Sequence, residues 1–161
     1  MSKLARIRPR VRTILVVDDE VDILLSLTEL FQTALDGVEV LTARDGPTAL
    51  DLLQFHPVDA IVCDYRMPGM DGLEVLRRAS QIAPEVPRIM LTAYPDLELA
   101  MRAINEAHIE SFLTKPVRAD PLLESVNAAL IKARRTRSAR PPAARSPPSL
   151  DIESDAAPET P

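Results

Sequence analysis

Hydrophobic and polar positions along the chain follow two alternating patterns. Short runs of β-branched and other apolar residues, typical of buried strands, occupy five stretches, 13–18, 38–42, 59–64, 87–92 and 109–114. Apolar residues at helical spacing follow each run, at 21–31, 49–53, 73–80, 97–104 and 122–130. The pattern predicts five strands alternating with five helices.

Buried strands separated by amphipathic helices are typical of an α/β fold, in which helices cover both faces of a parallel sheet. Because crossovers between parallel strands are right-handed, few topologies remain, and we expect a doubly wound sheet. Ligands of such open sheets bind beyond the carboxyl ends of the strands. The residues that end the strands are therefore the first candidates for a functional site.

Polar residues end four of the five predicted strands. Asp18 and Asp19 end the first, Asp64 the third and Thr92 the fourth, while Lys115 follows the fifth. Clustered carboxylates repel one another and need a cation, and an all-oxygen ligand set favours Mg²⁺, with Mn²⁺ as the alternative. A lysine beside the metal adds a point charge for phosphate, and a carboxylate can itself be phosphorylated.

Composition divides the chain into a body and two ends. Of 15 prolines, six fall in the last 24 residues, so we expect 135–161 to be a disordered tail rich in Pro, Ala and Ser. The expected domain is 12–134, preceded by a basic extension, 1–11. A single cysteine excludes a disulfide framework.

Charge follows the same division. Residues 14–131 hold 20 acidic and 8 basic groups, whereas 1–13 and 132–145 hold basic groups only and 146–161 only four acids. The acidic body argues against specific nucleic-acid binding, and we interpret the basic ends as solvated flanks. No apolar run is long enough to span a membrane, and the expected location is the cytoplasm.

Four motifs at the strand ends resemble the receiver domain of two-component response regulators. They are LVVDDE at 15–20, DYRMPGMDG at 64–72, LTAY at 91–94 and FLTKP at 112–116. The resemblance covers roughly 12–134 and implies a flavodoxin-like sheet of order 2-1-3-4-5, as in a stand-alone, chemotaxis-regulator-like receiver. It also implies a phosphoprotein that catalyses only its own phosphorylation and dephosphorylation.

The resemblance assigns roles around the expected phosphoacceptor, Asp64. Asp19 would bind Mg²⁺ directly, Asp18 largely through water, and Arg66 through its backbone carbonyl. Arg66 and Tyr94 each lie two residues after a site residue, where their side chains are expected to tune the lifetime of the phosphoryl group.

The remaining assignments concern the switch. Thr92 would be the switch hydroxyl and Lys115 the phosphate-binding lysine, aimed into the site by a cis bond to Pro116. Phe112 stands where many relatives have Tyr, so it can rotate but cannot make the hydroxyl hydrogen bond.

The implied function is to accept a phosphoryl group from a histidine kinase or phosphotransfer protein and to signal by protein–protein interaction. The fourth helix, fifth strand and fifth helix would bind an unknown downstream protein or form a homodimer; this face includes Arg102, Asn105, Glu106, His108 and Glu110. The alternative is a receiver-like interaction scaffold that does not use phosphorylation. An aspartyl-phosphate hydrolase is disfavoured, because Arg66 stands where its general acid would be.

Overall fold

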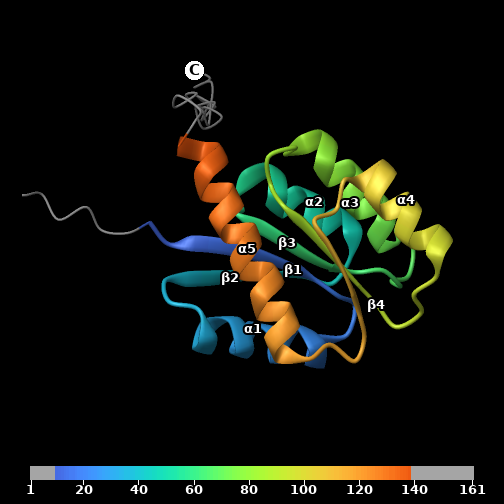
Figure 1. The fold of residues 1–161 in the computed structure, drawn as a ribbon, viewed down its shortest axis with the longest axis horizontal. Helices are drawn as coiled ribbons and strands as arrows, with labels where there is room; N and C mark the ends of the chain where they lie inside the picture. The colour runs from blue at the N-terminus through green and yellow to red at the C-terminus, as the bar shows by residue number, and fades with distance from the viewer. Residues whose placement is uncertain (1–9, 139–161) are drawn as a thin grey trace, which may run out of the picture.

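A computed structural model describes residues 10–138 of the chain; the expected tail beyond Ser138 and most of the basic extension lie outside them. Ten elements alternate along the chain (Figure 1). The strands are β1 (Arg12–Val17), β2 (Val38–Ala43), β3 (Ala60–Asp64), β4 (Arg88–Thr92) and β5 (Ser111–Thr114). The helices are α1 (Val21–Ala34), α2 (Gly46–Phe55), α3 (Gly72–Ile82), α4 (Leu97–Ala107) and α5 (Ala119–Ser138).

All five strands are parallel and form one sheet in the order β2-β1-β3-β4-β5. The predicted fold class and strand order are confirmed. Neighbouring carboxyl ends meet because Val17 lies opposite Cys63, Asp64 opposite Leu91, and Thr92 opposite Thr114.

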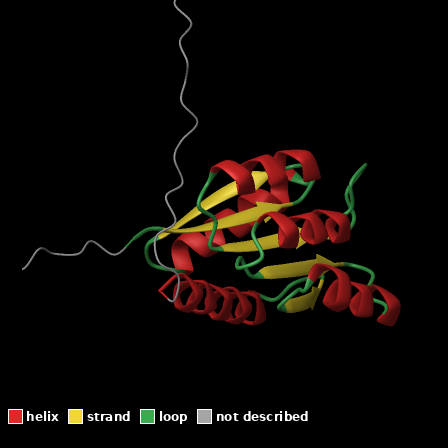
Figure 2. Ribbon diagram, turned by 90° about the horizontal axis from the view of Figure 1, so that it is seen from above, coloured by secondary structure: helices red, strands yellow, loops and turns green. Residues whose placement is uncertain are grey.

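The sheet separates two hydrophobic cores. Alternate residues of β1 enter opposite cores: Ile14 and Val16 pack with residues of α1 and α5, whereas Leu15 and Val17 pack with residues of α2, α3 and α4. Viewed from above, the helices lie on both sides of the strands (Figure 2). Both faces of the sheet are therefore covered, which leaves its edges and strand ends for ligands.

Helix starts show how local sequence fixes the loops beside the strand ends. Asp45, Asp71 and Asp96 cap α2, α3 and α4, each accepting a hydrogen bond from a backbone N–H of the first turn. At α1 the N-cap is Glu20, and its side chain makes no capping hydrogen bond. Asp18, which comes before this cap, instead accepts from the N–H of Glu20 and pairs with Lys115.

Helix α4 buries a different face from the one on which its larger apolar residues recur. The apolar residues at helical spacing in α4 are the exposed ones: Leu97 is 79%, Met101 51% and Ile104 53% exposed, while Leu99, Ala103 and Ala107 enter the core. Periodicity alone does not say which of two apolar faces is buried.

Helix α5 extends to Ser138, past the expected domain end at 134, which stays a prediction. Arg137 holds its last turn: it pairs with Asp59 at 2.9 Å and donates to the carbonyl of Val58 at 3.0 Å. Basic residues also suit the negative end of the helix dipole. No helix among residues 10–138 combines the length and apolarity that crossing a membrane requires.

Candidate functional site

The carboxyl ends of four strands bring the predicted site residues to one edge of the sheet. Asp18 follows β1, Asp64 and Thr92 are the last residues of β3 and β4, and Lys115 follows β5. Asp18, Asp64 and Thr92 are buried. Each strand delivers one polar group directly after an apolar run, which explains how such groups come to lie against the core.

Three carboxylates face one ammonium group. Asp18, Asp19 and Asp64 each offer an oxygen, and these oxygens lie within 4.8 Å of one another. Lys115 Nζ lies 2.9 Å from Asp18 Oδ2 and 2.8 Å from Asp64 Oδ1. One lysine neutralises only one of three charges, so the cluster keeps an excess of negative charge that suits a cation.

Backbone contacts hold these groups in place. Asp18 Oδ1 accepts from the N–H of Glu20 at 2.9 Å, which leaves Oδ2 for Lys115. The N–H of Lys115 donates to the carbonyl of Thr92 at 2.7 Å, and the Lys115–Pro116 bond is cis. Both ends of the ion pair are therefore fixed by the sheet edge itself.

Gly72, at the start of α3, lies against the backbone of the third strand end. A Cβ at this position would come within 2.0 Å of the backbone oxygen of Asp64. The N–H of Gly72 also donates to the carbonyl of Tyr65 at 2.7 Å. The loop after Asp64 can thus close only with glycine at this position.

Burial and neighbouring charges shift the pKa values at the site. Burial raises the pKa of Asp64, Lys115 opposes that rise, and the charges of Asp18 and Asp19 add to it. For Lys115, burial lowers the pKa, but the hydrogen bonds and charges of Asp64 and Asp18 outweigh it, so the net pKa is raised. Lys115 is therefore held as a cation, while negative charge on Asp64 is opposed by its surroundings.

Arg66 and Tyr94 form a pair above the strand ends. The guanidinium carbon of Arg66 lies 4.4 Å from the centre of the Tyr94 ring, a cation–π contact. Both side chains are exposed. The sequence placed both near the site but did not indicate that they contact each other.

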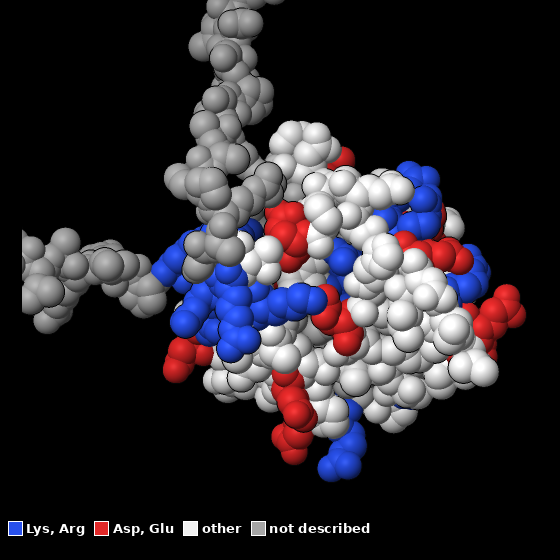
Figure 3. Space-filling view, turned by 45° about the horizontal axis from the view of Figure 1, so that its top comes forward, with Lys and Arg blue, Asp and Glu red and all other residues white. Residues whose placement is uncertain are grey.

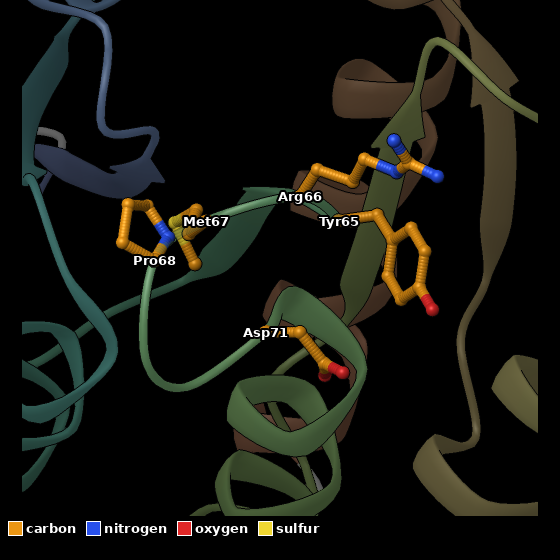
Figure 4. A pocket seen from close by; sticks show the side chains of 5 residues that line it. All are labelled: Tyr65, Arg66, Met67, Pro68 and Asp71. Carbon is orange, nitrogen blue, oxygen red and sulfur yellow. The ribbon is translucent and has the colours of Figure 1, made fainter.

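The loop after Asp64 lines a surface pocket of about 390 Å³. In Figure 4, Tyr65 and Arg66 project to one side of the loop and Met67 and Pro68 to the other, with Asp71 at the start of α3. None of the three clustered carboxylates lines this pocket. Asp71 was missing from the predicted site, although an Asp three residues before Glu74 is a helix-start signal.

The two expected switch residues differ in their surroundings. Thr92 is fully buried, and its hydroxyl oxygen accepts from the N–H of Tyr94 at 3.2 Å. Phe112 lies opposite Met90 in the sheet and packs against the core beneath α2, α3 and α4. The structure places Phe112 in this apolar cluster, whereas Thr92 lies at the strand end.

An acidic edge on a doubly wound sheet of order 2-1-3-4-5, with one lysine opposite the carboxylates, defines the phosphoacceptor modules of two-component signalling. The family model for the response regulator receiver domain matches residues 14–127. The chain belongs to this family.

Curated relatives carry a similar domain within longer proteins. The chain is 38% identical over 118 residues to the hydrogenase transcriptional regulatory protein HoxA of Cupriavidus necator, covering 73% of this chain and 24% of that protein. It is 37% identical to the transcriptional regulatory protein GlrR of Escherichia coli over 117 residues, covering 73% and 26%. The chain thus spans about a quarter of the length of these relatives.

Solved structures show the same fold. The signal receiver domain of an HD domain-containing protein from Pseudomonas fluorescens is 37% identical with a TM-score of 0.74, covering 78% of this chain and 99% of that one. A CheY-like receiver domain protein from Methanospirillum hungatei is 28% identical with a TM-score of 0.73, covering 78% and 98%.

Proposed function

We propose that Asp64 accepts a phosphoryl group from a phosphohistidine on a histidine kinase or phosphotransfer protein. The observation that carries this proposal is the position of Asp64, buried at the end of β3, ion-paired to Lys115 and within a cluster of carboxylates. A cytoplasmic location, expected from the sequence, is part of the same proposal.

The transfer uses groups that already lie together. An Asp64 carboxylate oxygen attacks the phosphorus as the P–N bond of the donor breaks, and the bond's electron pair stays on the imidazole, which takes up a proton. Lys115, now 2.8 Å from Asp64, would pair with a phosphoryl oxygen. The Thr92 hydroxyl would donate to another.

The residues at the site fit a divalent cation. Their oxygens are hard ligands, and one ammonium leaves two negative charges uncompensated, which fits Mg²⁺ or Mn²⁺. Asp19, Asp64 and the backbone carbonyl of Arg66 would hold it, with Asp18 holding it largely through water. When bound, such an ion neutralises charge on the phosphoryl group during transfer.

The output is assigned to α4, β5 and α5. The exposed stripe of Leu97, Met101 and Ile104 offers an apolar surface, rimmed by the Arg102–Glu106 ion pair at 3.0 Å. A state of Thr92 and Phe112 favoured by phosphorylation would alter this face for a downstream protein or a second copy. If the homodimer forms, Met101→Glu should abolish a phosphorylation-dependent rise in solution mass.

A labelling experiment tests the phosphoacceptor. The protein is incubated with acetyl phosphate and Mg²⁺, and the expected product is an acid-stable, base-labile phosphoprotein that does not form with EDTA. Asp64→Asn should take no label. Asp71→Asn is the matched control, because asparagine can still cap α3 and should leave labelling intact.

Label retained in Asp64→Asn would move the phosphoacceptor elsewhere. No label in the wild type would favour the alternative, an interaction scaffold that keeps the fold without using phosphorylation.

A further inference from the structure

A second pocket lies at the amino end of the sheet, the end opposite the acidic site. Its volume is about 670 Å³. The chain entering β1, the turn before β2, the residue before β3 and the last turns of α5 line it: Arg10, Arg12, Asp36, Gly37, Asp59, Leu130, Ile131, Arg134 and Arg137. Neither the phosphorylation chemistry nor the α4 face uses these residues.

The pocket lining combines arginines with two apolar residues, Leu130 and Ile131. Four arginines face two aspartates. One aspartate, Asp59, is already engaged, since it accepts from the N–H of Thr13 at 2.9 Å and pairs with Arg137. Ile131 is 50% exposed. The pocket therefore suits a ligand that brings apolar groups together with carboxylates.

Figure 3 shows Lys and Arg side chains gathered on this side of the molecule, where the described chain enters β1 and leaves α5. The gathering contrasts with the rest of the domain, since residues 14–131 hold 20 acidic and 8 basic groups. A long polyanion such as nucleic acid would meet repulsion beyond the patch. A short acidic segment fits the area better.

The same chain contains a segment with this chemistry. Residues 150–153 read Leu-Asp-Ile-Glu, and Asp155 follows shortly after. Apolar and acidic residues alternate along this segment. Residues 146–161 contain four acids and no basic residue.

The segment is tethered next to the pocket. Arg134 and Arg137 lie in the last turns of α5, and only residues 139–149 separate that helix from Leu150. Such a length can span up to about 40 Å. A tether this short gives an effective concentration on the order of millimolar, so a weak site is enough.

We propose that residues 150–155 dock intramolecularly in the amino-end pocket. Leu150 and Ile152 cover Ile131 and its apolar surroundings, while Asp151, Glu153 and Asp155 pair with arginines of the pocket lining. The basic end of α5 is then masked by the chain's own acidic segment. The interaction does not depend on phosphorylation of Asp64.

A spin-label experiment on the full chain tests this. Cys63 is fully buried, so a thiol-reactive nitroxide labels only the cysteine introduced by Ser154→Cys. We expect broadening of amide signals at 10–12, 36–37 and 130–137, with those at 18–20 and 64–66 unaffected. The broadening should be lost at 1 M NaCl, because the Debye length falls to about 3 Å.

Two matched variants separate the two sides of the contact. Neutralising the segment with Asp151→Asn, Glu153→Gln and Asp155→Asn should abolish the broadening, and so should Arg10→Glu in the pocket. Both changes alter exposed or terminal positions and leave the core intact. Broadening that persists in both variants would overturn the proposal.

Two further outcomes would also overturn it. Equal broadening when spin-labelled chains are mixed with isotope-labelled, spin-free chains would assign the segment to a second copy. Equal signal shifts on adding a short DNA duplex to the wild type and to the neutralised variant would assign the pocket to nucleic acid.

Discussion

The two ends of the sheet treat buried charge in opposite ways. At the amino end, Arg88 is buried and donates to five backbone carbonyls, and Asp59 is shared between Arg137 and a backbone N–H. At the carboxyl end, Asp18, Asp19 and Asp64 cluster, and Lys115 pairs with Asp18 and Asp64. At the first end the buried Arg88 and Asp59 are both satisfied by partners, whereas the carboxylates of the second end carry an excess of negative charge.

This difference separates charges that hold the fold from charges that bind a ligand. Burying a charge is costly unless it is paired or fully hydrogen-bonded. Arg88 meets that cost through the carbonyls of Ala107, His108 and the loop that follows α3, so it joins α3, α4 and β4. The carboxylates do not meet it without a cation. Removing a charged side chain should therefore lower stability at the amino end. At the carboxyl end it should raise stability but abolish phosphorylation.

The largest effect is expected from removing the buried Arg88 at the amino end of the sheet. Arg88→Met leaves buried carbonyls without donors and should lower the free energy of unfolding by about 3 kcal/mol in urea denaturation. The same substitution at the exposed, ion-paired Arg78 should cost under about 0.5 kcal/mol. Equal losses in the two variants would show that the carbonyl contacts of Arg88 contribute nothing.

The next effect concerns the backbone beneath the acidic end. Gly72→Ala should lower the free energy of unfolding by about 2 kcal/mol, because its Cβ would lie 2.0 Å from the Asp64 oxygen. It should also slow phosphorylation, since relieving that contact displaces Asp64.

Gly69→Ala is the control for Gly72→Ala. Gly69 has a φ of +77° and no atom within 4 Å of the Cβ position, so alanine should cost about 1 kcal/mol in backbone strain alone. Phosphorylation of this variant should be normal. A normal rate in Gly72→Ala would mean that the close approach does not position Asp64.

A smaller change in the free energy of unfolding, of opposite sign, is expected at the carboxyl end of the sheet. In the presence of a chelator, Asp64→Asn should raise the free energy of unfolding by about 1 kcal/mol while abolishing phosphorylation. The raised pKa of Asp64 means that the folded state holds this proton more tightly than the unfolded state. Ionisation of Asp64 therefore lowers stability as pH rises through the interval above its usual pKa of 3.8.

Urea denaturation of both proteins across this pH interval measures that effect. The gain from Asp64→Asn should be absent at the acidic end and present at neutral pH. A loss of stability at neutral pH would show that the Lys115 pair outweighs the repulsion.

The smallest effect is kinetic. Because Arg66 and Tyr94 stack, Arg66→Ala and Tyr94→Ala should each shorten the phosphoryl lifetime by about two- to fivefold, as expected for one exposed cation–π contact. The double variant should be no faster than either single one, and Tyr94→Phe, which keeps the ring, should behave as wild type. Unchanged rates in both alanine variants would contradict a role in tuning.

The carboxyl end could be predicted from the sequence because each site residue directly follows an apolar run, and the strand direction then places all of them at one edge. The amino end was missed for the converse reason. Arg137 contacts Asp59 and Val58, which lie far from it in the sequence. Arg88 donates to backbone carbonyls, and no sequence motif indicates such contacts.

Two further features depend on tertiary context. Leu97, Met101 and Ile104 have the spacing of a core face but are exposed. The residues of α4 that are buried in the core are Leu99, Ala103 and Ala107. Smaller side chains let α4 approach its neighbours, which spacing does not reveal. The Arg66–Tyr94 contact joins loops after different strands, and its geometry follows only from the assembled sheet edge.

A divalent cation should neutralise the carboxylates of the carboxyl end, and the most direct test is the effect of Mg²⁺ on the unfolding of matched variants from the two ends. At 100 times the dissociation constant, Mg²⁺ should add about 2.7 kcal/mol to the free energy of unfolding of the wild type. Asp59→Asn should be less stable than wild type but should keep this gain, whereas Asp19→Asn should lose it. The same gain in all three proteins, or none in the wild type, would contradict the account.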